Sequence, residues 1–261
     1  MDLGIRGKVA LVTGASDGLG LAAARALAGE GVSLAIAARR TDRLKAAAEE
    51  ICAATGAEVL ALPADVTDRG QAKYLVSEVA SRLGSVEILV ANSGGPRPGR
   101  FGDLAWEDWT EAFARVVGPL HHLVSAVLPA MREACWGRIV SIQSVSIRQP
   151  VESLLLSNAL RPAAAGLVKG LAAELATSGI TVNVVGPGPS RTDRILELGR
   201  FRSPDADDDE LARSLGDQVP IGRLVEPDEV AAAIAYLCSA QAAAVTGMYL
   251  PVDGGMIRGQ M

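Results

Sequence analysis

The sequence predicts a doubly wound α/β domain of three layers: a sheet of about seven parallel strands with helices on both faces, as in a Rossmann fold. Short apolar runs alternate with longer helical patterns along the whole chain. The runs lack polar alternation, which is typical of parallel strands that are covered on both faces. A glycine-rich turn joins the first apolar run to the first helical pattern, as a nucleotide-binding α/β unit requires.

Strands and helices are predicted to alternate from end to end. Each predicted strand is a short run rich in Val, Ile, Leu or Ala, and each predicted helix is a longer segment with apolar residues at helical spacing. No linker and no repeat divides the chain, so one domain is expected over residues 1–261. The predicted strands are residues 9–12, 32–37, 59–62, 88–91, 139–142, 181–185 and 248–252, and the predicted helices are residues 18–29, 42–54, 70–83, 106–133, 157–177 and 227–239.

Composition excludes several classes of protein. Apolar residues make up 49% of the chain and aromatic residues only 3%, so the core must be built from Ala, Val, Leu and Ile. The net charge is −5 and no basic block occurs, which argues against nucleic acid as a partner. No apolar run is long enough to span a membrane, and no signal peptide is expected. Three scattered cysteines show neither metal spacing nor a disulfide framework, which favours a cytoplasmic location and no metal site.

The glycine-rich turn is the strongest functional signal. Residues 13–20 read T-G-x-x-x-G-x-G between a predicted strand and a predicted helix. Glycine permits unusual backbone angles and close approach of a ligand, and a helix N-terminus suits a diphosphate. A bare structural turn is the alternative. The predicted cofactor-binding residues of this turn are Gly14, Ser16, Asp17, Gly18, Leu19 and Gly20.

The end of the second predicted strand indicates which cofactor is bound. An NAD-binding domain usually carries an acid about 20 residues after the glycine motif. Here Ala38 stands at that place and Arg39 and Arg40 follow it. A guanidinium can form a bidentate pair with a 2′-phosphate, so we predict NADP(H) in preference to NAD(H). Two ordinary surface arginines are the alternative.

These motifs resemble those of the short-chain dehydrogenase/reductase family, and within it the 3-oxoacyl-acyl-carrier-protein reductases. The resemblance covers residues 7–255. It implies a homo-oligomer, a tetramer or a dimer, that acts on a small-molecule substrate. Family members that prefer NADP often carry a basic residue where this chain has Asp17, which argues mildly against NADP.

The resemblance also assigns cofactor contacts beyond the glycine turn. It implies that Asp65 and Val66 contact the adenine, although Asp65 can instead belong to the start of the next helix. Residues 91–94 resemble the family's N-N-A-G motif, with Ala91 and Ser93 as departures. The remaining implied contacts are Asn92 and Gly94 near the ribose, and Pro187, Gly188 and Thr192 near the nicotinamide and diphosphate.

The catalytic motif departs from the family pattern. Ser144 matches the serine that hydrogen-bonds the substrate carbonyl. The family places a tyrosine 13 residues later and a lysine four beyond it, where this chain has Ser157 and Arg161. A further family position, an Asn that holds a water, falls on Val116. Lys169 is two turns too far along the helix to replace the missing lysine.

These departures change the expected chemistry without removing it. A serine hydroxyl is a much weaker acid than tyrosine, and arginine is effectively never deprotonated. The predicted activity is hydride transfer between NADPH and a carbonyl or alcohol with an altered proton relay. Ser144 would polarise the substrate oxygen, Arg161 would supply positive charge and hold the nicotinamide ribose, and Ser157 or water would pass the proton. The alternatives are a non-redox enzyme, such as an isomerase, dehydratase or cyclase, and a catalytically inactive NADP(H)-binding protein.

Two loops are candidates for substrate recognition. An acidic insertion at residues 203–210 is either a solvated surface loop or part of a mobile lid at about 193–217. The loop at residues 95–101 follows the fourth predicted strand and is expected near the substrate. His121 and His122, adjacent on a predicted helix, are interpreted as ordinary helix residues because their side chains point about 100° apart.

Overall fold

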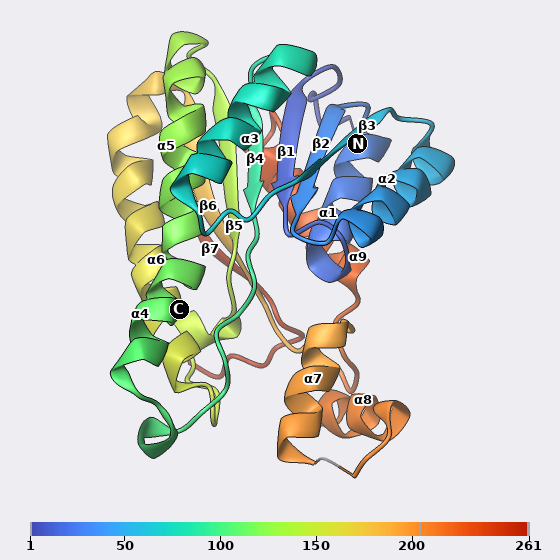
Figure 1. Cartoon of the computed structure of the whole chain (residues 1–261), viewed down its shortest axis with the longest axis vertical. Helices are drawn as coiled ribbons and strands as arrows, with labels where there is room; N and C mark the ends of the chain where they lie inside the picture. Colours follow the sequence, from blue (N-terminus) through green and yellow to red (C-terminus); the bar gives the residue numbers. More distant parts are fainter. Residues whose placement is uncertain (1, 204, 260–261) are drawn as a thin grey trace.

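The computed structural model, which describes residues 2–203 and 205–259, contains a parallel sheet of seven strands in the order β3-β2-β1-β4-β5-β6-β7 (Figure 1). Every neighbouring pair of these strands runs parallel. The predicted fold class is confirmed. The strands are β1 (Val9–Thr13), β2 (Ser33–Ala38), β3 (Val59–Pro63), β4 (Ile88–Ala91), β5 (Gly137–Ile142), β6 (Ile180–Pro187) and β7 (Tyr249–Val252).

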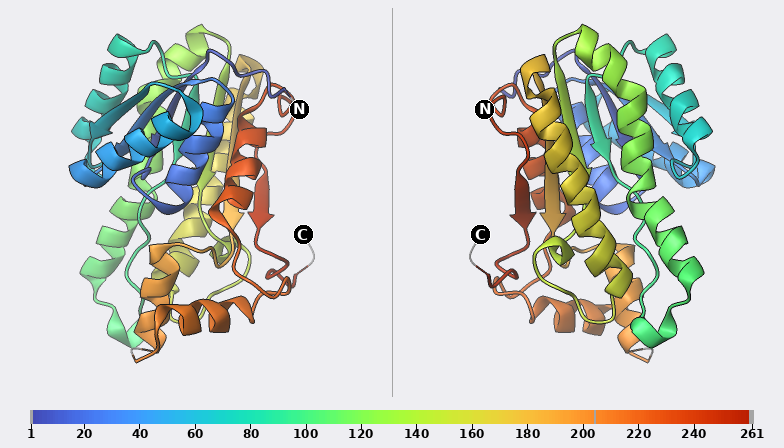
Figure 2. Two further views of the ribbon diagram at one scale, coloured as in Figure 1. Left: turned by 90° about the vertical axis from the view of Figure 1, so that its right-hand side faces the viewer. Right: turned by 90° about the vertical axis from the view of Figure 1, so that its left-hand side faces the viewer.

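Helices cover both faces of the sheet (Figure 2). Successive strand residues point to opposite faces, so Leu11 and Val12 of β1 enter different cores. One core contains Leu11 with residues of α3 (Arg69–Arg82), α5 (Gly118–Glu133) and α6 (Leu155–Leu175). The other contains Val12 with residues of α1 (Gly18–Gly29), α2 (Thr41–Thr55) and α9 (Pro227–Cys238). Burial on both faces explains why the strands are continuously apolar.

The single helix predicted over residues 106–133 is wrong, because the segment forms α4 (Trp106–Val116) and α5 with a break at Val117. Pro119 lies in the first turn of α5 and has no N–H to donate to the carbonyl four residues earlier. That carbonyl belongs to Arg115, and it accepts a hydrogen bond from Ser93 Oγ at 2.9 Å instead. The break therefore ties the end of α4 to the loop after β4.

The strand order reverses between β1 and β4, and a crevice forms outside the carboxyl ends of strands at such a point. Beyond these ends lie α7 (Asp193–Arg202) and α8 (Asp208–Gly216), drawn in orange in Figure 1. The alternative of a surface loop at residues 203–210 is therefore wrong for its second half, which begins α8. Asp207 caps this helix through the Glu210 N–H, and acidic side chains are favourable in a first helical turn. Residue 204 lies outside the described residues.

Candidate active site

A cleft of about 590 Å³ lies at the carboxyl ends of the strands and brings most of the predicted site residues together. Its walls come from the turns after β1, β2, β3, β4, β5 and β6, and from α6 and α7. Gly20 is not among the lining residues. The predicted residues that line the cleft are Gly14, Ser16, Asp17, Gly18, Leu19, Arg39, Arg40, Asp65, Val66, Asn92, Gly94, Ser144, Ser157, Arg161, Pro187, Gly188 and Thr192.

The glycine turn has a backbone that few other residues could adopt. Gly14 and Gly18 have φ angles of +59° and +54°. A Cβ on Gly20 would lie 2.1 Å from the Gly14 carbonyl oxygen, so Gly20 lets the turn close on itself. The Asn92 amide donates to the same carbonyl at 3.1 Å and fixes the turn to the end of β4. The side chain of Asp17, the N-cap of α1, makes no capping bond, which leaves first-turn N–H groups without a side-chain acceptor.

Charged side chains gather at one end of the cleft, beside the glycine turn. Arg40 forms an ion pair with Asp17 at 2.5 Å, and Arg43 lies 3.5 Å from the same carboxylate. Within residues 2–203 and 205–259, no ion pair joins Arg39 to an acid. This end of the cleft therefore offers guanidinium groups to a phosphate, but Asp17 competes with the phosphate for one of them.

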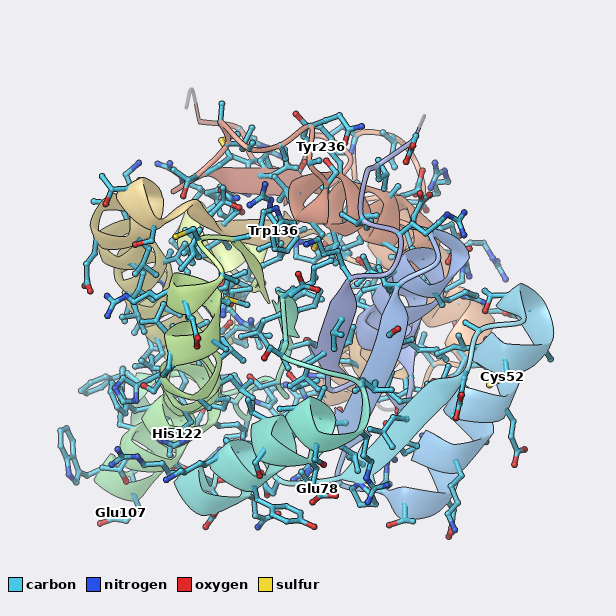
Figure 3. All side chains as sticks on the ribbon, turned by 90° about the horizontal axis from the view of Figure 1, so that it is seen from above. Cys52, Glu78, Glu107, His122, Trp136 and Tyr236 are labelled. Carbon is cyan, nitrogen blue, oxygen red and sulfur yellow. The ribbon has the colours of Figure 1, made fainter. Side chains whose placement is uncertain are left out.

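Asp65 and Val66 lie in the turn between β3 and α3. Burial raises the pKa of Asp65, but hydrogen bonds from Thr67 and the charge of Arg39 outweigh it and hold the pKa below its usual value. Asp68, not Asp65, caps α3 through the Gln71 N–H. His122 lies on α5 (Figure 3). Its Nδ1 is 3.4 Å from the carbonyl oxygen of Val66.

The two serines of the predicted catalytic cluster, Ser144 after β5 and Ser157 at the start of α6, are connected through Ser146. Helix α6 begins two residues before Ser157, so this serine lies in its first turn. Ser157 Oγ is 3.2 Å from Ser146 Oγ. Ser144 Oγ accepts the Ser146 N–H at 3.1 Å, and the Ser144 carbonyl accepts the Tyr249 hydroxyl at 3.2 Å. The Ser144 hydroxyl proton is not used in these bonds and can point into the cleft.

Arg161 lies one helical turn after Ser157, on the same face of α6. Its Nε donates to Ser157 Oγ at 3.1 Å, and its Nη1 donates to Gln143 Oε1 at 3.2 Å. Burial, and secondly the charge of Arg194, lowers the pKa of Arg161 to about 10. The side chain therefore stays positively charged near pH 7 and strengthens the hydrogen bond to Ser157. Lys169 lies away from the cluster, with its Nζ 3.3 Å from the Gly247 carbonyl.

The turn after β6 connects the cleft to α7. A Cβ on Gly188 would lie 2.8 Å from the Cα of Asp253, so only glycine permits this close approach. The methyl group of Thr192 would lie 3.2 Å from a Cβ on Gly18, which places the beginning of α7 against the glycine turn. The turn thus extends from the Asp253 backbone to the glycine turn after β1.

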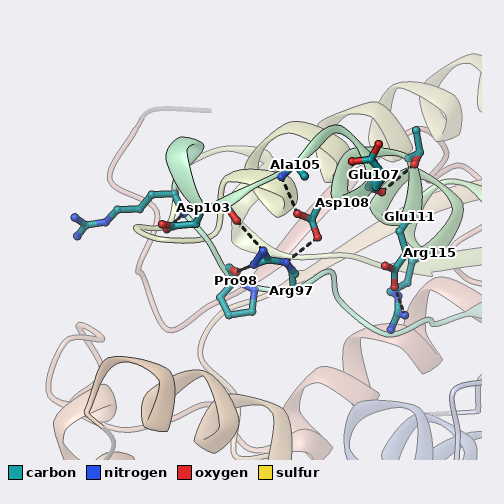
Figure 4. A network of polar contacts seen from close by, with 10 residues as sticks. Arg97, Pro98, Asp103, Ala105, Glu107, Asp108, Glu111 and Arg115 are labelled. Atoms are coloured by element: carbon teal, nitrogen blue, oxygen red, sulfur yellow. Dashed lines mark hydrogen bonds and ion pairs between the residues drawn. The ribbon is translucent and has the colours of Figure 1, made fainter.

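Only the first part of the loop at residues 95–101 reaches the cleft. Gly95 and Pro96 line it, whereas residues 97–101 do not. Arg97 donates to Asp108 at 2.8 Å and to the Asp103 carbonyl at 2.7 Å, and the same Asp108 accepts the Ala105 N–H at the start of α4 (Figure 4). This network holds the second part of the loop against α4.

Within the described ranges, no three His, Cys, Asp or Glu side chains are grouped so that they could hold a metal ion. None of the helices that the structure describes is both long and apolar enough to cross a membrane.

Comparisons with known proteins identify the family. A family model described as enoyl-(acyl carrier protein) reductase matches residues 14–257. The chain is 35% identical to the 3-oxoacyl-(acyl-carrier-protein) reductase FabG of Escherichia coli (strain K12) over 254 residues, which are 97% of this chain and 99% of that relative. The chain belongs to the short-chain dehydrogenase/reductase family.

Solved structures of two reductases with NADPH share the fold closely. An L-sorbose reductase from Gluconobacter frateurii, complexed with NADPH and L-sorbose, has a TM-score of 0.94 at 32% identity, with both chains fully covered. A variant of actinorhodin polyketide ketoreductase with NADPH has a TM-score of 0.92 at 36% identity, and the match covers 97% of this chain and 98% of the other.

Sequence reasoning missed three side chains in this short-chain dehydrogenase/reductase, one of which is Ser146, the hydroxyl partner of Ser157. Gln143 was not predicted, although it directly precedes Ser144 at the end of a predicted strand. It is buried, accepts from Arg161 and donates to Ser141 Oγ at 2.7 Å. Arg194 lies two residues after Thr192 and lines the cleft. An amide side chain directly before the serine that matches the family motif is a signal that the sequence does contain.

Proposed function

We propose that this chain is an NADP(H)-dependent oxidoreductase that transfers hydride between NADPH and a carbonyl or alcohol substrate. One observation carries the proposal: the glycine turn and the Ser144, Ser157 and Arg161 cluster line the same cleft. The family relationship to reductases supports the reaction class. The NADPH complexes of similar structures support the choice of cofactor. A homo-oligomer and a cytoplasmic location stay predictions.

The residues of the cleft fit an adenine dinucleotide phosphate. The uncapped N–H groups at the start of α1 would hold the diphosphate, and Arg39 and Arg40 would hold the 2′-phosphate. The adenine would rest against Asp65 and Val66, and Asn92 would keep the glycine turn in place beneath the ribose. The nicotinamide end would be held by the turn from Pro187 to Thr192 and by Arg161.

When bound, NADPH supplies the hydride, and the side chains of this chain manage the proton and the negative charge. Ser144 would donate a hydrogen bond to the substrate carbonyl oxygen. Ser157, which accepts a bond from Arg161, would give its hydroxyl proton to the oxygen that becomes the alcohol. Because Ser157 lines the cleft, water in the cleft would return the proton to Ser157, while the buried Ser146 Oγ, 3.2 Å away, would hold the Ser157 hydroxyl in position. The charge of Arg161 would stabilise negative charge at either oxygen.

A serine in this role limits the rate. Losing a well-matched general acid costs about 10²–10⁴-fold. The same feature favours the two alternatives of a non-redox enzyme and an inactive NADP(H)-binding protein, because neither needs a strong acid at Ser157.

The test follows NADPH and NADP⁺ consumption against a panel of ketones and alcohols. The natural protein is compared with Arg161→Ala and with a Ser157→Tyr/Arg161→Lys double variant. We expect slow turnover by the natural protein and loss of at least about tenfold in Arg161→Ala, because a charge-assisted bond is lost. Turnover only in the double variant would contradict the proposal. Product formation without cofactor consumption would then favour a non-redox enzyme, and no product would favour a binding protein.

A further inference from the structure

Two arginines from different helices converge on one point of the cleft. A Cβ built on Gly95 would lie 3.4 Å from Nη2 of Arg161, in α6, and 3.4 Å from Nη2 of Arg194, in α7. The two nitrogens are therefore separated by at most twice this distance. Gly95, Arg161 and Arg194 all line the cleft.

Among the described residues, the one carboxylate paired with either arginine is Glu197, on the same helix as Arg194. Arg161 donates to two neutral groups, the Ser157 hydroxyl and the Gln143 amide oxygen, and in the part of the chain that the structure describes no ion pair joins it to an acid. Arg194 pairs through Nη1 with Glu197, which is largely exposed and three residues along the same helix. Its Nη2 donates to the Pro96 carbonyl at 2.7 Å. Two like charges this close repel each other unless an anion lies between them.

The position of the pair selects the kind of anion. In the proposed function, the start of α1 would serve the diphosphate of the dinucleotide, and Arg39 and Arg40 would serve its 2′-phosphate. Arg161, in contrast, touches Ser157, the proposed proton donor, through the same guanidinium. An anion bound at its Nη2 would therefore lie close to the reacting carbonyl. Guanidinium groups match the planar, two-oxygen geometry of a carboxylate.

We propose that Arg161 and Arg194 bind a carboxylate of the substrate, so that the preferred substrates are 2-oxo or 3-oxo acids. The proposal rests on the proposed reductase function and names its substrate class. The carboxylate would take the place of the Pro96 carbonyl at Arg194 and would connect α7 to the body of the domain. Neutral ketones would leave the two charges facing each other.

The test compares NADPH-dependent reduction of a 2-oxo acid and a 3-oxo acid with reduction of their methyl esters. The variants are Arg194→Gln and Arg194→Lys, and the matched control is Arg200→Gln. Arg200 lies on the same helix, pairs with Asp208 and does not line the cleft. We expect the natural protein to prefer an acid by about tenfold or more in kcat/KM, since bonds to charged groups contribute about 1.5–3 kcal/mol. Arg194→Gln should lose that preference through a lower kcat/KM for the acid, Arg194→Lys should keep part of the preference, and Arg200→Gln should keep all of it.

Binding measurements separate failure of this site from failure of the reductase function. Calorimetry on the NADPH-loaded protein uses oxamate, a carboxylate analogue of a 2-oxo acid, and oxamide, its neutral counterpart. Selective, Arg194-dependent binding of oxamate supports the site even if no carbonyl compound is reduced. Equal turnover of acid and ester by the natural protein overturns the site and leaves the reductase function standing. A loss of NADPH affinity in Arg194→Gln that affects acid and ester alike also overturns the site, because the arginine would then serve the cofactor.

Discussion

Cofactor choice should depend on three charged side chains at one end of the cleft. We consider an Arg39→Ala/Arg40→Ala double variant and, separately, Asp17→Asn. The proposed function places the 2′-phosphate at these arginines, which line the cleft, and Asp17 holds Arg40 in an ion pair at 2.5 Å. Removing the arginines takes away the partners of the phosphate, whereas removing the Asp17 charge releases Arg40 and lowers the repulsion of the phosphate.

The expected changes in NADPH affinity depend on how exposed the charged side chains are. Each hydrogen bond to a charged group contributes about 1.5–3 kcal/mol, and the lower value applies here because both arginines are exposed to solvent. Two such bonds amount to about 3 kcal/mol, or roughly a 100-fold loss of NADPH affinity. An exposed ion pair such as that of Arg40 with Asp17 contributes about 0.2–1 kcal/mol. Asp17→Asn should therefore tighten NADPH binding by up to about fivefold.

The assay is fluorescence titration of each protein with NADPH and with NADH, at two salt concentrations. NADH binding should change little in every variant, because NADH has no 2′-phosphate. Arg43→Ala, which removes a more distant contact of Asp17, is the control for a general loss of positive charge. An unchanged NADPH-to-NADH ratio in the double variant would refute the reasoning, and so would weaker NADPH binding in Asp17→Asn.

Two further predictions concern stability. Ser93→Ala should lower the free energy of unfolding by about 1 kcal/mol, because the Arg115 carbonyl loses its donor. Adding Pro119→Ala should recover part of this loss by restoring a backbone N–H. Urea denaturation of the single and double variants measures both effects, and strictly additive changes in stability would contradict the prediction. Burial, with Asp253 nearby, raises the pKa of Tyr249 to about 12, so this phenol keeps its proton between pH 10 and 12 only in the folded state. The stability it contributes is complete below pH 10 and is lost as the pH rises through 12, so the advantage of the natural protein over Tyr249→Phe should fall across this window by on the order of 2 kcal/mol; a constant difference would contradict the assignment.

The fold was predictable because its signals are local. A strand buried on both faces must be apolar throughout, and the seven predicted strands coincide with β1–β7 to within a few residues. The split between α4 and α5 also has a local signal, but the prediction of a single helix did not take this signal into account. Pro119 inside a helical pattern removes a backbone donor, and the sequence does not reveal that Ser93, far away in the chain, replaces it.

The cofactor end of the cleft was predictable for a related reason. The carboxyl ends of parallel strands meet at one edge of the sheet, so residues that follow β1, β2, β3 and β4 must be neighbours once the strand order is known. The interaction of Asp17 with Arg40 was not predicted, because periodicity places backbones but does not say which exposed side chains pair.

The catalytic end was harder because its contacts join residues from three separate elements. Arg161 at the position of a lysine looks like a conservative change, yet a guanidinium has more donors than an ammonium and needs more acceptors. Gln143 supplies one acceptor at the end of β5, and Ser157 supplies another on α6. The remaining Nη2 faces Gly95 together with Arg194 of α7, where no carboxylate among the described residues is paired with Arg161. Arginine thus does more here than hold a positive charge. Its five donors lie on three nitrogens, so Nη2 can serve a ligand while Nε and Nη1 hold Ser157 and Gln143, whereas a lysine would carry its three donors on a single nitrogen.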